Sequence, residues 1–297
     1  MSPRVSGIIP ALMTALNDDE TIDEAGLRAH SSRLIDAGVD GLFCLGTNGE
    51  FFVMSRAEKL EVIRVVVDEV AGRVPVHAGV GCIGTLETIE LARDAAAAGV
   101  DALSVVTPYF AAASQDELYT HYAAVADAVD TPVVVYNIPM RTGVGISPAL
   151  IEKLSRIPGI VGVKDSSGNF DTMLQYIERT PDDFAVLSGN DGLILWNLLA
   201  GGHGAVTAVA NVLPETIVSI HREWSAGNLA AARAAQDAIR PLRLAQRHGN
   251  PNTIMKLAAN LAGFGLGPCR APFNQVCEEA VQEVEQVLEA CRTAGIH

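Results

Sequence analysis

Eight short runs of β-branched and other apolar residues recur along the 297-residue chain, and segments of helical period separate them. Runs such as VDALSVV and GIVGVK carry apolar residues in both alternating sets of positions, as is typical of parallel strands covered on both faces. We predict strands over residues 5–14, 40–47, 74–80, 101–107, 132–137, 159–164, 184–188 and 204–209. Eight strand–helix units predict an α/β fold, a closed (β/α)8 TIM barrel; an open, doubly wound sheet is the alternative.

Signals for the beginnings and ends of helices lie between these runs. A serine or threonine followed three residues later by glutamate forms a capping box, in which hydroxyl and carboxylate satisfy free N–H groups of the first turn. We predict capping boxes at Thr21–Glu24, Ser55–Glu58 and Ser114–Glu117, and a proline at the first helical position at Ser147-Pro148. Glycines that close helices predict helix ends at Gly38, Gly72 and Gly99.

The pattern changes from about residue 227, where helical segments follow one another with no strand between them. Residues 228–248, 252–262 and 273–292 have the helical period, and Pro241 predicts a kink in the first of these helices. We therefore predict a (β/α)8 barrel over residues 1–226 and a C-terminal helical extension over residues 227–297 that packs on it.

The charge and cysteine content limit the partners of the chain. With 35 acidic and 21 basic residues its net charge is −14, whereas a surface for nucleic acid or anionic lipid needs clustered Lys and Arg. The apolar window 192–200 is far shorter than the ~20 residues that span a bilayer, and the N-terminus lacks a secretory apolar region. The five cysteines form no C-x-x-C pair. We expect a cytoplasmic protein that acts on small molecules, with no nucleic-acid or membrane partner.

The end of the sixth predicted strand carries the first candidate for chemistry. Catalytic groups of a (β/α)8 barrel lie at the C-terminal ends of strands, and Lys164 emerges there from the apolar run 159–163. An amine that burial keeps partly neutral can attack a ketone carbonyl. Tyr136 ends the neighbouring fifth strand, where its phenol can deliver and remove protons. Taken singly, Lys164 is better interpreted as a strand-end lysine that reaches solvent and pairs with Asp165, and Tyr136 as a core ring with a satisfied hydroxyl.

Two loops add candidates for binding. Gly46-Thr47-Asn48-Gly49-Glu50 follows the second strand and offers backbone N–H groups and a hydroxyl suited to a carboxylate, although Gly and Asn are also ordinary turn residues. Arg141 lies five residues after Tyr136, where its guanidinium can bind the distal carboxylate of a second substrate. A solvent-exposed surface arginine is the alternative.

Five motifs together resemble the dihydrodipicolinate synthase and N-acetylneuraminate lyase family, over essentially the full chain. In the family's order and spacing they are Gly46-Thr47-x-Gly49-Glu50, Val106-Thr107-Pro108-Tyr109, Tyr136-Asn137-x-Pro139, Gly162-x-Lys164-Asp165 and Gly201-Gly202-His203-Gly204. The resemblance implies a class I lyase that needs neither metal nor cofactor, because Lys164 forms an imine with pyruvate. It also implies a homotetramer or homodimer.

The resemblance implies a role for each candidate residue. Tyr136 shuttles protons, Thr47 supplies a relay hydroxyl, and Thr47 and the amide of Asn48 hold the pyruvate carboxylate. The matching positions that line the substrate pocket are Tyr109, Gly189 and Val206. Arg141 matches the arginine that binds the carboxylate of aspartate semialdehyde. The branch implied is therefore the synthase branch, which makes 4-hydroxy-tetrahydrodipicolinate from pyruvate and aspartate semialdehyde.

The chain also departs from the synthase pattern. Phe110 stands where the synthases have a relay tyrosine, and Asn48 replaces the usual threonine. Phe51, Phe52 and Ile83 occupy positions of an allosteric lysine pocket where small or polar groups are expected. A 2-keto-3-deoxy sugar acid or 4-hydroxy-2-oxoglutarate aldolase that uses the same imine is one alternative. A barrel that binds pyruvate without turnover is another.

Two other enzyme classes have less support. A metal-dependent aldolase needs clustered ligands, and the seven histidines show no H-x-H or H-E-x-x-H spacing. A phosphate-binding barrel is suggested by the glycines of 189–192 and 201–204. However, Gly201 and Gly202 precede the eighth strand, where they favour the end of a helix.

Overall fold

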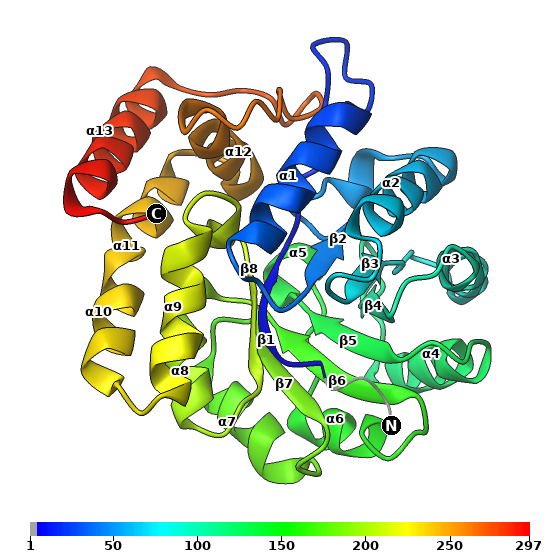
Figure 1. Cartoon of the computed structure of the whole chain (residues 1–297). Helices are drawn as coiled ribbons and strands as arrows, with labels where there is room; N and C mark the ends of the chain where they lie inside the picture. The colour runs from blue at the N-terminus through cyan, green and yellow to red at the C-terminus, as the bar shows by residue number, and fades with distance from the viewer. Residues whose placement is uncertain (1–4) are drawn as a thin grey trace. The chain divides into compact units, whose positions relative to one another are not determined.

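The structure is a computed structural model that describes residues 5–297. All eight predicted strands are present, each at the predicted place, and strands alternate with helices along the chain (Figure 1). The strands are β1 (Gly7–Pro10), β2 (Leu42–Cys44), β3 (Val76–Gly79), β4 (Ala102–Val106), β5 (Val133–Asn137), β6 (Ile160–Asp165), β7 (Ala185–Ser188) and β8 (Gly204–Thr207).

Helices separate the strands and then continue to the C-terminus. Between the strands lie α1 (Glu24–Asp36), η1 (Phe51–Val53), α2 (Arg56–Val70), α3 (Thr85–Ala97), α4 (Gln115–Asp127), α5 (Pro139–Thr142), α6 (Pro148–Leu154), α7 (Phe170–Arg179), η2 (Asp191–Leu193) and α8 (Ile194–Leu199). After β8 come η3 (Val209–Asn211), α9 (Pro214–Ser225), α10 (Leu229–Ala238), α11 (Arg240–Ala245), η4 (Gln246–His248), α12 (Pro251–Leu261) and α13 (Glu278–Ala294).

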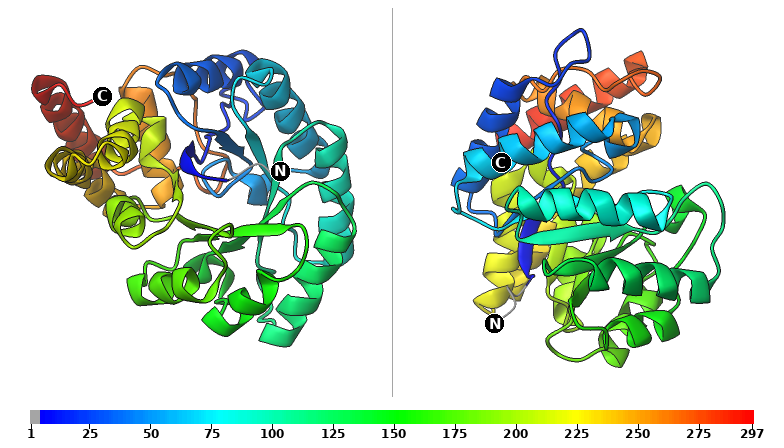
Figure 2. Two further views of the ribbon diagram at one scale, coloured as in Figure 1. Left: turned by 60° about the horizontal axis from the view of Figure 1, so that its bottom comes forward. Right: turned by 90° about the vertical axis from the view of Figure 1, so that its right-hand side faces the viewer.

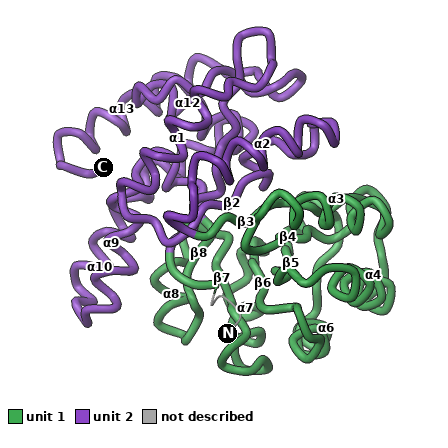
Figure 3. The backbone as a smooth tube through the Cα atoms, turned by 45° about the vertical axis from the view of Figure 1, so that its right-hand side comes forward, with its two compact units in different colours: residues 1–7, 75–206 green, residues 8–74, 207–297 purple. Residues whose placement is uncertain are grey.

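The chain forms two compact units, which Figure 3 shows in different colours. Unit 1 comprises residues up to 7 and 75–206, and unit 2 comprises residues 8–74 and 207–297. We predicted a different division, between residues 226 and 227, and it stays a prediction. Residues 1–4 of the predicted barrel lie outside the described part of the chain.

Unit 1 contains a parallel sheet with β3 to β8 in sequence order. The helices α3, α4, α6 and α7 pack in the same order beside it, each against the next (Figures 1 and 2). All residues of β4 and β5 are buried, which explains why their sequences are apolar in both sets of alternating positions. Because the strands are parallel, their C-terminal ends meet at one edge of this sheet.

Unit 2 contains the loop after β2 and the C-terminal helices. Residues 8–10 of β1 and the following Ala11 lie beside β2: Asp40 N–H donates to Ile8 O and Leu12 N–H to Phe43 O, both at 2.8 Å. Helix α1 packs on α2, α9 on α10, and α13 on both α11 and α12.

Most predicted helix signals are confirmed. Ser55 and Ser114 form complete capping boxes, and Ser147 caps α6 with proline at its start. Helices α1, α2 and α3 each end two residues before the predicted glycine, with one alanine as the C-cap between them. The three glycines, Gly38, Gly72 and Gly99, have positive φ.

Three details differ from the predictions. The capping box at Thr21 is wrong: Asp23 caps α1 by accepting from Gly26 N–H, while the Thr21 hydroxyl donates to Asp19. The predicted helix 228–248 is divided into α10 and α11, with Pro241 in the first turn of α11, where its missing N–H costs least. The last helix begins at Glu278, five residues later than predicted, with Glu278 and Glu279 in its first turn, where carboxylates are favourable.

Candidate active site

Lys164 and Tyr136 are neighbours at the ends of two adjacent strands of unit 1. The parallel register of β5 and β6 pairs Tyr136 with Lys164, so both side chains leave the sheet on the same face. Lys164 Nζ lies 3.9 Å from the centroid of the Tyr136 ring, and each residue is only 3% exposed. The negative face of an aromatic ring attracts a cation at this distance. The candidate nucleophile and the candidate proton carrier therefore share one buried site.

A hydrogen-bond network behind this pair fixes the register. The next register pair, Asn137 and Asp165, points to the opposite face, where Asn137 Nδ2 donates to Asp165 Oδ1 at 2.7 Å. Asn137 Nδ2 also donates to the Tyr176 hydroxyl at 3.3 Å, and Asn137 Oδ1 accepts from Ile146 N–H at 3.1 Å. Ser167 Oγ donates to the other oxygen of Asp165 at 2.7 Å.

The same network sets the ionisation of Asp165. Burial raises the pKa of this carboxyl group, while the hydrogen bonds from Ser167 and Asn137 oppose the rise. Sequence reasoning used Asp165 only as a possible partner of Lys164 and gave Asn137 no role. The signal available was two polar residues at the ends of adjacent buried strands, a position where unpaired polar groups are costly.

Gly189 follows β7 and borders the Lys164 side chain. A Cβ atom at Gly189 would lie 3.1 Å from Lys164 Cε and 2.0 Å from Ser166 Oγ. Gly189 N–H donates to Asp165 O at 2.7 Å, and Ser166 Oγ donates to Gly189 O at 3.3 Å. Because Gly189 has no side chain, the Lys164 side chain can occupy the position that it has in the structure.

The other candidate residues of unit 1 also lie at or after strand ends. Arg141 is exposed in the short helix α5, and Tyr109 is half-buried after β4, where burial raises the pKa of its phenol. Val206 is buried in β8. Phe110, one of the residues that depart from the synthase pattern, is 97% exposed and has a φ of +77°. Of the candidate residues of unit 1, Tyr136 and Gly189 lie beside Lys164.

Thr47 and Asn48 belong to unit 2, where the loop after β2 is held by backbone and side-chain hydrogen bonds. Thr47 O accepts from Glu50 N–H at 3.1 Å and from Asn252 Nδ2 at 2.5 Å. Thr14 Oγ1 donates to Gly49 O at 2.9 Å. Thr47 and Asn48 themselves are partly exposed.

A buried ion pair holds the end of this loop. Lys256 Nζ lies 2.8 Å from Glu50 Oε1, and the two side chains are 2% and 1% exposed. Arg270 N–H donates to the other oxygen of Glu50 at 2.8 Å, and its guanidinium pairs with Glu58, holding the pKa of that carboxyl group at about 2. Sequence reasoning missed Asn252 and Lys256. A lysine inside the apolar run IMKLAA of a predicted helix is the signal that points to a buried partner.

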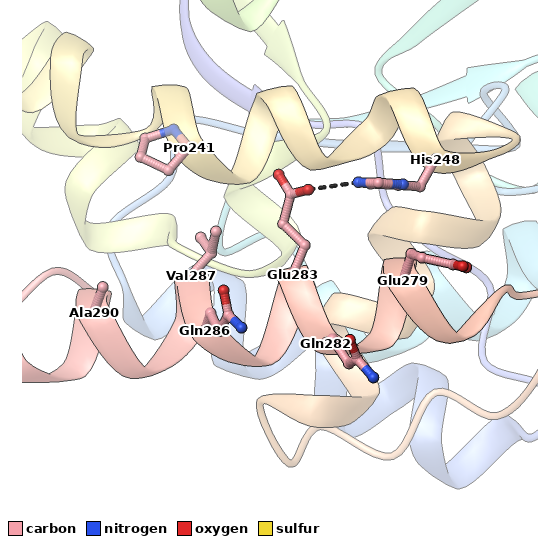
Figure 4. A pocket seen from close by; sticks show the side chains of 8 residues that line it. All are labelled: Pro241, His248, Glu279, Gln282, Glu283, Gln286, Val287 and Ala290. Atoms are coloured by element: carbon pink, nitrogen blue, oxygen red, sulfur yellow. Dashed lines mark hydrogen bonds and ion pairs between the residues drawn. The ribbon is translucent and has the colours of Figure 1, made fainter.

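A separate groove of about 500 Å³ lies between α11 and α13 in unit 2 (Figure 4). His248 Nε2 and Glu283 Oε2 lie 2.5 Å apart in it, and Arg247 pairs with the same carboxylate at 2.6 Å. Among the lining residues, His248 and Glu283 thus satisfy each other. None of the candidate active-site residues lines this groove.

No group of three or more His, Cys, Asp and Glu side chains in residues 5–297, the part of the chain that the structure describes, is arranged to hold a metal ion. No helix within it has both the length and the apolar character needed to cross a membrane.

The chain has the fold of two solved structures of the dihydrodipicolinate synthase family. The chain matches dihydrodipicolinate synthase DapA-2 of Bacillus anthracis with a TM-score of 0.93 and 33% identity, covering 96% of this chain and 98% of that one. It matches YagE, a prophage protein of the dihydrodipicolinic acid synthase family from Escherichia coli K12 in complex with pyruvate, with a TM-score of 0.94 and 32% identity, covering 97% and 99%. The predicted fold, a (β/α)8 barrel with helices added at the C-terminus, is confirmed, and the open-sheet alternative is wrong.

Sequence comparison gives the same family. The 4-hydroxy-tetrahydrodipicolinate synthase of Methanopyrus kandleri is 40% identical over 291 residues, which are 97% of each chain. The model of the Dihydrodipicolinate synthetase family matches residues 4–291. The chain therefore belongs to the Dihydrodipicolinate synthetase family and is an enzyme of its lyase class.

Proposed function

We propose that this chain condenses pyruvate with aspartate semialdehyde through an imine on Lys164, as a 4-hydroxy-tetrahydrodipicolinate synthase. The observation that carries the proposal is the buried amine of Lys164 at 3.9 Å from the Tyr136 ring. The family and the name of the Methanopyrus kandleri relative support the reaction, and the pyruvate bound in the Escherichia coli relative supports the first substrate.

The reaction begins at the ketone carbon of pyruvate. Lys164 Nζ attacks this carbon as a neutral amine, and the carbinolamine loses water to give a protonated imine. The imine is the electron sink that allows a methyl proton of pyruvate to leave, giving an enamine. The enamine carbon then bonds to the aldehyde carbon, whose oxygen takes a proton. Attack on the imine carbon releases the lysine, by water or by the substrate's own amine; cleavage of an aldol product is the reverse path.

The residues of the chain supply binding and proton transfer in this scheme. Tyr136, beside Lys164, carries protons to and from the carbinolamine and the new hydroxyl. Thr47 and the N–H of Asn48 bind the pyruvate carboxylate, with the Thr47 hydroxyl in the proton relay, and Arg141 binds the carboxylate of the second substrate. Tyr109, Gly189 and Val206 line the substrate pocket. No metal or cofactor takes part.

Phe110 bears on the identity of the second substrate. Phe110 has no hydroxyl, so the proton relay of a synthase cannot pass through this position. A 2-keto-3-deoxy sugar acid or 4-hydroxy-2-oxoglutarate aldolase tolerates this change, because the imine at Lys164 serves both reactions. A pyruvate-binding barrel without turnover is the non-catalytic alternative.

A panel assay separates these functions. Enzyme and pyruvate are mixed in parallel with aspartate semialdehyde, glyoxylate and glyceraldehyde, and cleavage of 2-keto-3-deoxy sugar acids is followed separately, each with Lys164→Ala as the control. We expect turnover with aspartate semialdehyde that Lys164→Ala abolishes. Rapid cleavage of a keto-deoxy acid without turnover of aspartate semialdehyde would replace the synthase by the aldolase. If no substrate is turned over in any arm, the remaining function is that of a pyruvate-binding barrel without turnover.

We further propose a cytoplasmic homotetramer or homodimer. Within residues 5–297 none of the five cysteines forms a disulfide, which agrees with a reducing compartment. In unit 1, large apolar side chains are exposed at Leu86 (78%), Phe110 (97%) and Met140 (88%), which agrees with a surface covered by another copy. Sedimentation measurements test the oligomer, and a monomer at micromolar concentration would contradict it.

A further inference from the structure

The helix α12 contacts the loop that we propose as the carboxylate site. We infer that Asn252 is a positioning residue that aims the Asn48 N–H at the pyruvate carboxylate, and that the Glu50–Lys256 ion pair holds the loop for this task. The inference rests on the proposed function and gives the C-terminal helices a part in substrate binding.

The argument starts from the peptide bond between Thr47 and Asn48. This bond is planar and trans, so the Asn48 N–H points opposite to the Thr47 carbonyl. Thr47 O accepts from Glu50 N–H at 3.1 Å and from Asn252 Nδ2 at 2.5 Å, which uses both lone pairs of the oxygen. Fixing the carbonyl from two sides fixes the direction of the Asn48 N–H. Asn252 supplies one of these two bonds, and it is 4% exposed.

The loop needs such support because its backbone is strained. Leu45 and Glu50 have φ values of +56° and +59°, which are unfavourable for residues with a side chain. Between them, a Cβ atom at Gly49 would lie 3.0 Å from Leu45 N and 3.1 Å from Leu12 O, so the loop closes tightly on itself. A strained conformation persists only where the surrounding structure determines it.

The Glu50–Lys256 ion pair holds the end of the loop in this strained conformation. Glu50 lies between Lys256 on one oxygen and Arg270 N–H on the other, both at 2.8 Å. Lys256 and Asn252 are four residues apart on α12, so they lie on one face of the helix. One helix face therefore contacts both ends of the segment Thr47–Glu50.

The test separates carboxylate binding from imine formation. Lys164 is trapped with borohydride in the presence of pyruvate or of acetone, a ketone that forms an imine but has no carboxylate. The variants are Asn252→Ala and Asn252→Asp; the second keeps the side-chain shape without the N–H donor and serves where the first does not fold. Asn260→Ala is the matched control, because Asn260 on the same helix also bonds a loop, through Gly267 O at 2.8 Å and Leu266 N–H at 2.7 Å.

We expect the Asn252 variants to raise the pyruvate concentration for half-maximal trapping roughly tenfold, the equivalent of one hydrogen bond. The acetone concentration for half-maximal trapping should stay within about twofold of the wild-type value. In Asn260→Ala, the half-maximal concentrations of both pyruvate and acetone should stay within the same range. The inference is overturned if folded Asn252 variants keep the wild-type pyruvate dependence, or if pyruvate and acetone trapping fall together. Absence of pyruvate trapping in the wild type is a different result: it overturns the proposed function, and this inference with it.

Discussion

The buried ion pair between Glu50 and Lys256 gives the sharpest stability test of the loop after β2. Lys256→Met keeps much of the side-chain volume but leaves the Glu50 carboxylate, 1% exposed, without its cation. Breaking a buried pair by removing one partner costs about 3–5 kcal/mol. Because Glu50 retains the hydrogen bond from Arg270 N–H, we expect the low end, about 3 kcal/mol.

The double variant Glu50→Gln/Lys256→Met removes both charges. A neutral amide can still accept from Arg270 N–H, and no unpaired charge stays buried, so we expect a loss of only about 1 kcal/mol. The double variant should thus be more stable than Lys256→Met by about 2 kcal/mol. Urea unfolding followed by circular dichroism, with equal slopes for all variants, measures the difference. Equal stability of the two variants, or a loss below 1 kcal/mol in Lys256→Met, would refute the reasoning.

Three further predictions concern unit 1. Asn137→Ala removes the bonds to Asp165 and Ile146; we expect it to slow borohydride trapping at Lys164 about tenfold while a full set of helices persists by circular dichroism, and an unchanged rate contradicts the positioning role. Gly189→Ala should also lower this rate, since its Cβ would lie 3.1 Å from Lys164 Cε; normal trapping would show that the lysine moves freely. Burial lowers the pKa of His77 from 6.5 to about 4, so the unfolded chain binds the proton first as pH falls. The contribution of His77 to the free energy of unfolding should therefore be complete above pH 6.5 and fall by roughly 3 kcal/mol toward pH 4, and His77→Gln should remove this part of the slope in urea titrations.

The strands and most helix ends were predictable because their signals are local. A parallel strand covered on both faces needs apolar residues at successive positions, and the capping boxes at Ser55 and Ser114 need only four residues each. The prediction at Thr21 was wrong because a second residue near the start of α1 can also cap the helix. Asp23 directly precedes the helix and its carboxylate accepts from Gly26 N–H, so Asp23 is the N-cap.

The pairing of Lys164 with Tyr136 was predictable from the sequence because the C-terminal ends of parallel strands meet at one edge of the sheet. The residues that hold the loop of the candidate site were not predictable. Asn252 bonds Thr47 across 205 residues, and Lys256 pairs with Glu50 across 206. Helical period and strand alternation report which face of an element is buried, but they do not report which distant polar group meets it there.

Borohydride trapping with pyruvate tests the central claim most directly. The protein is treated with pyruvate and borohydride, digested, and its peptides are mapped by mass spectrometry, with Lys164→Ala as the control. The imine account predicts one carboxyethyl group on Lys164, saturating with pyruvate and absent without it. An unmodified Lys164, or a modification that persists at another lysine in Lys164→Ala, would contradict the account.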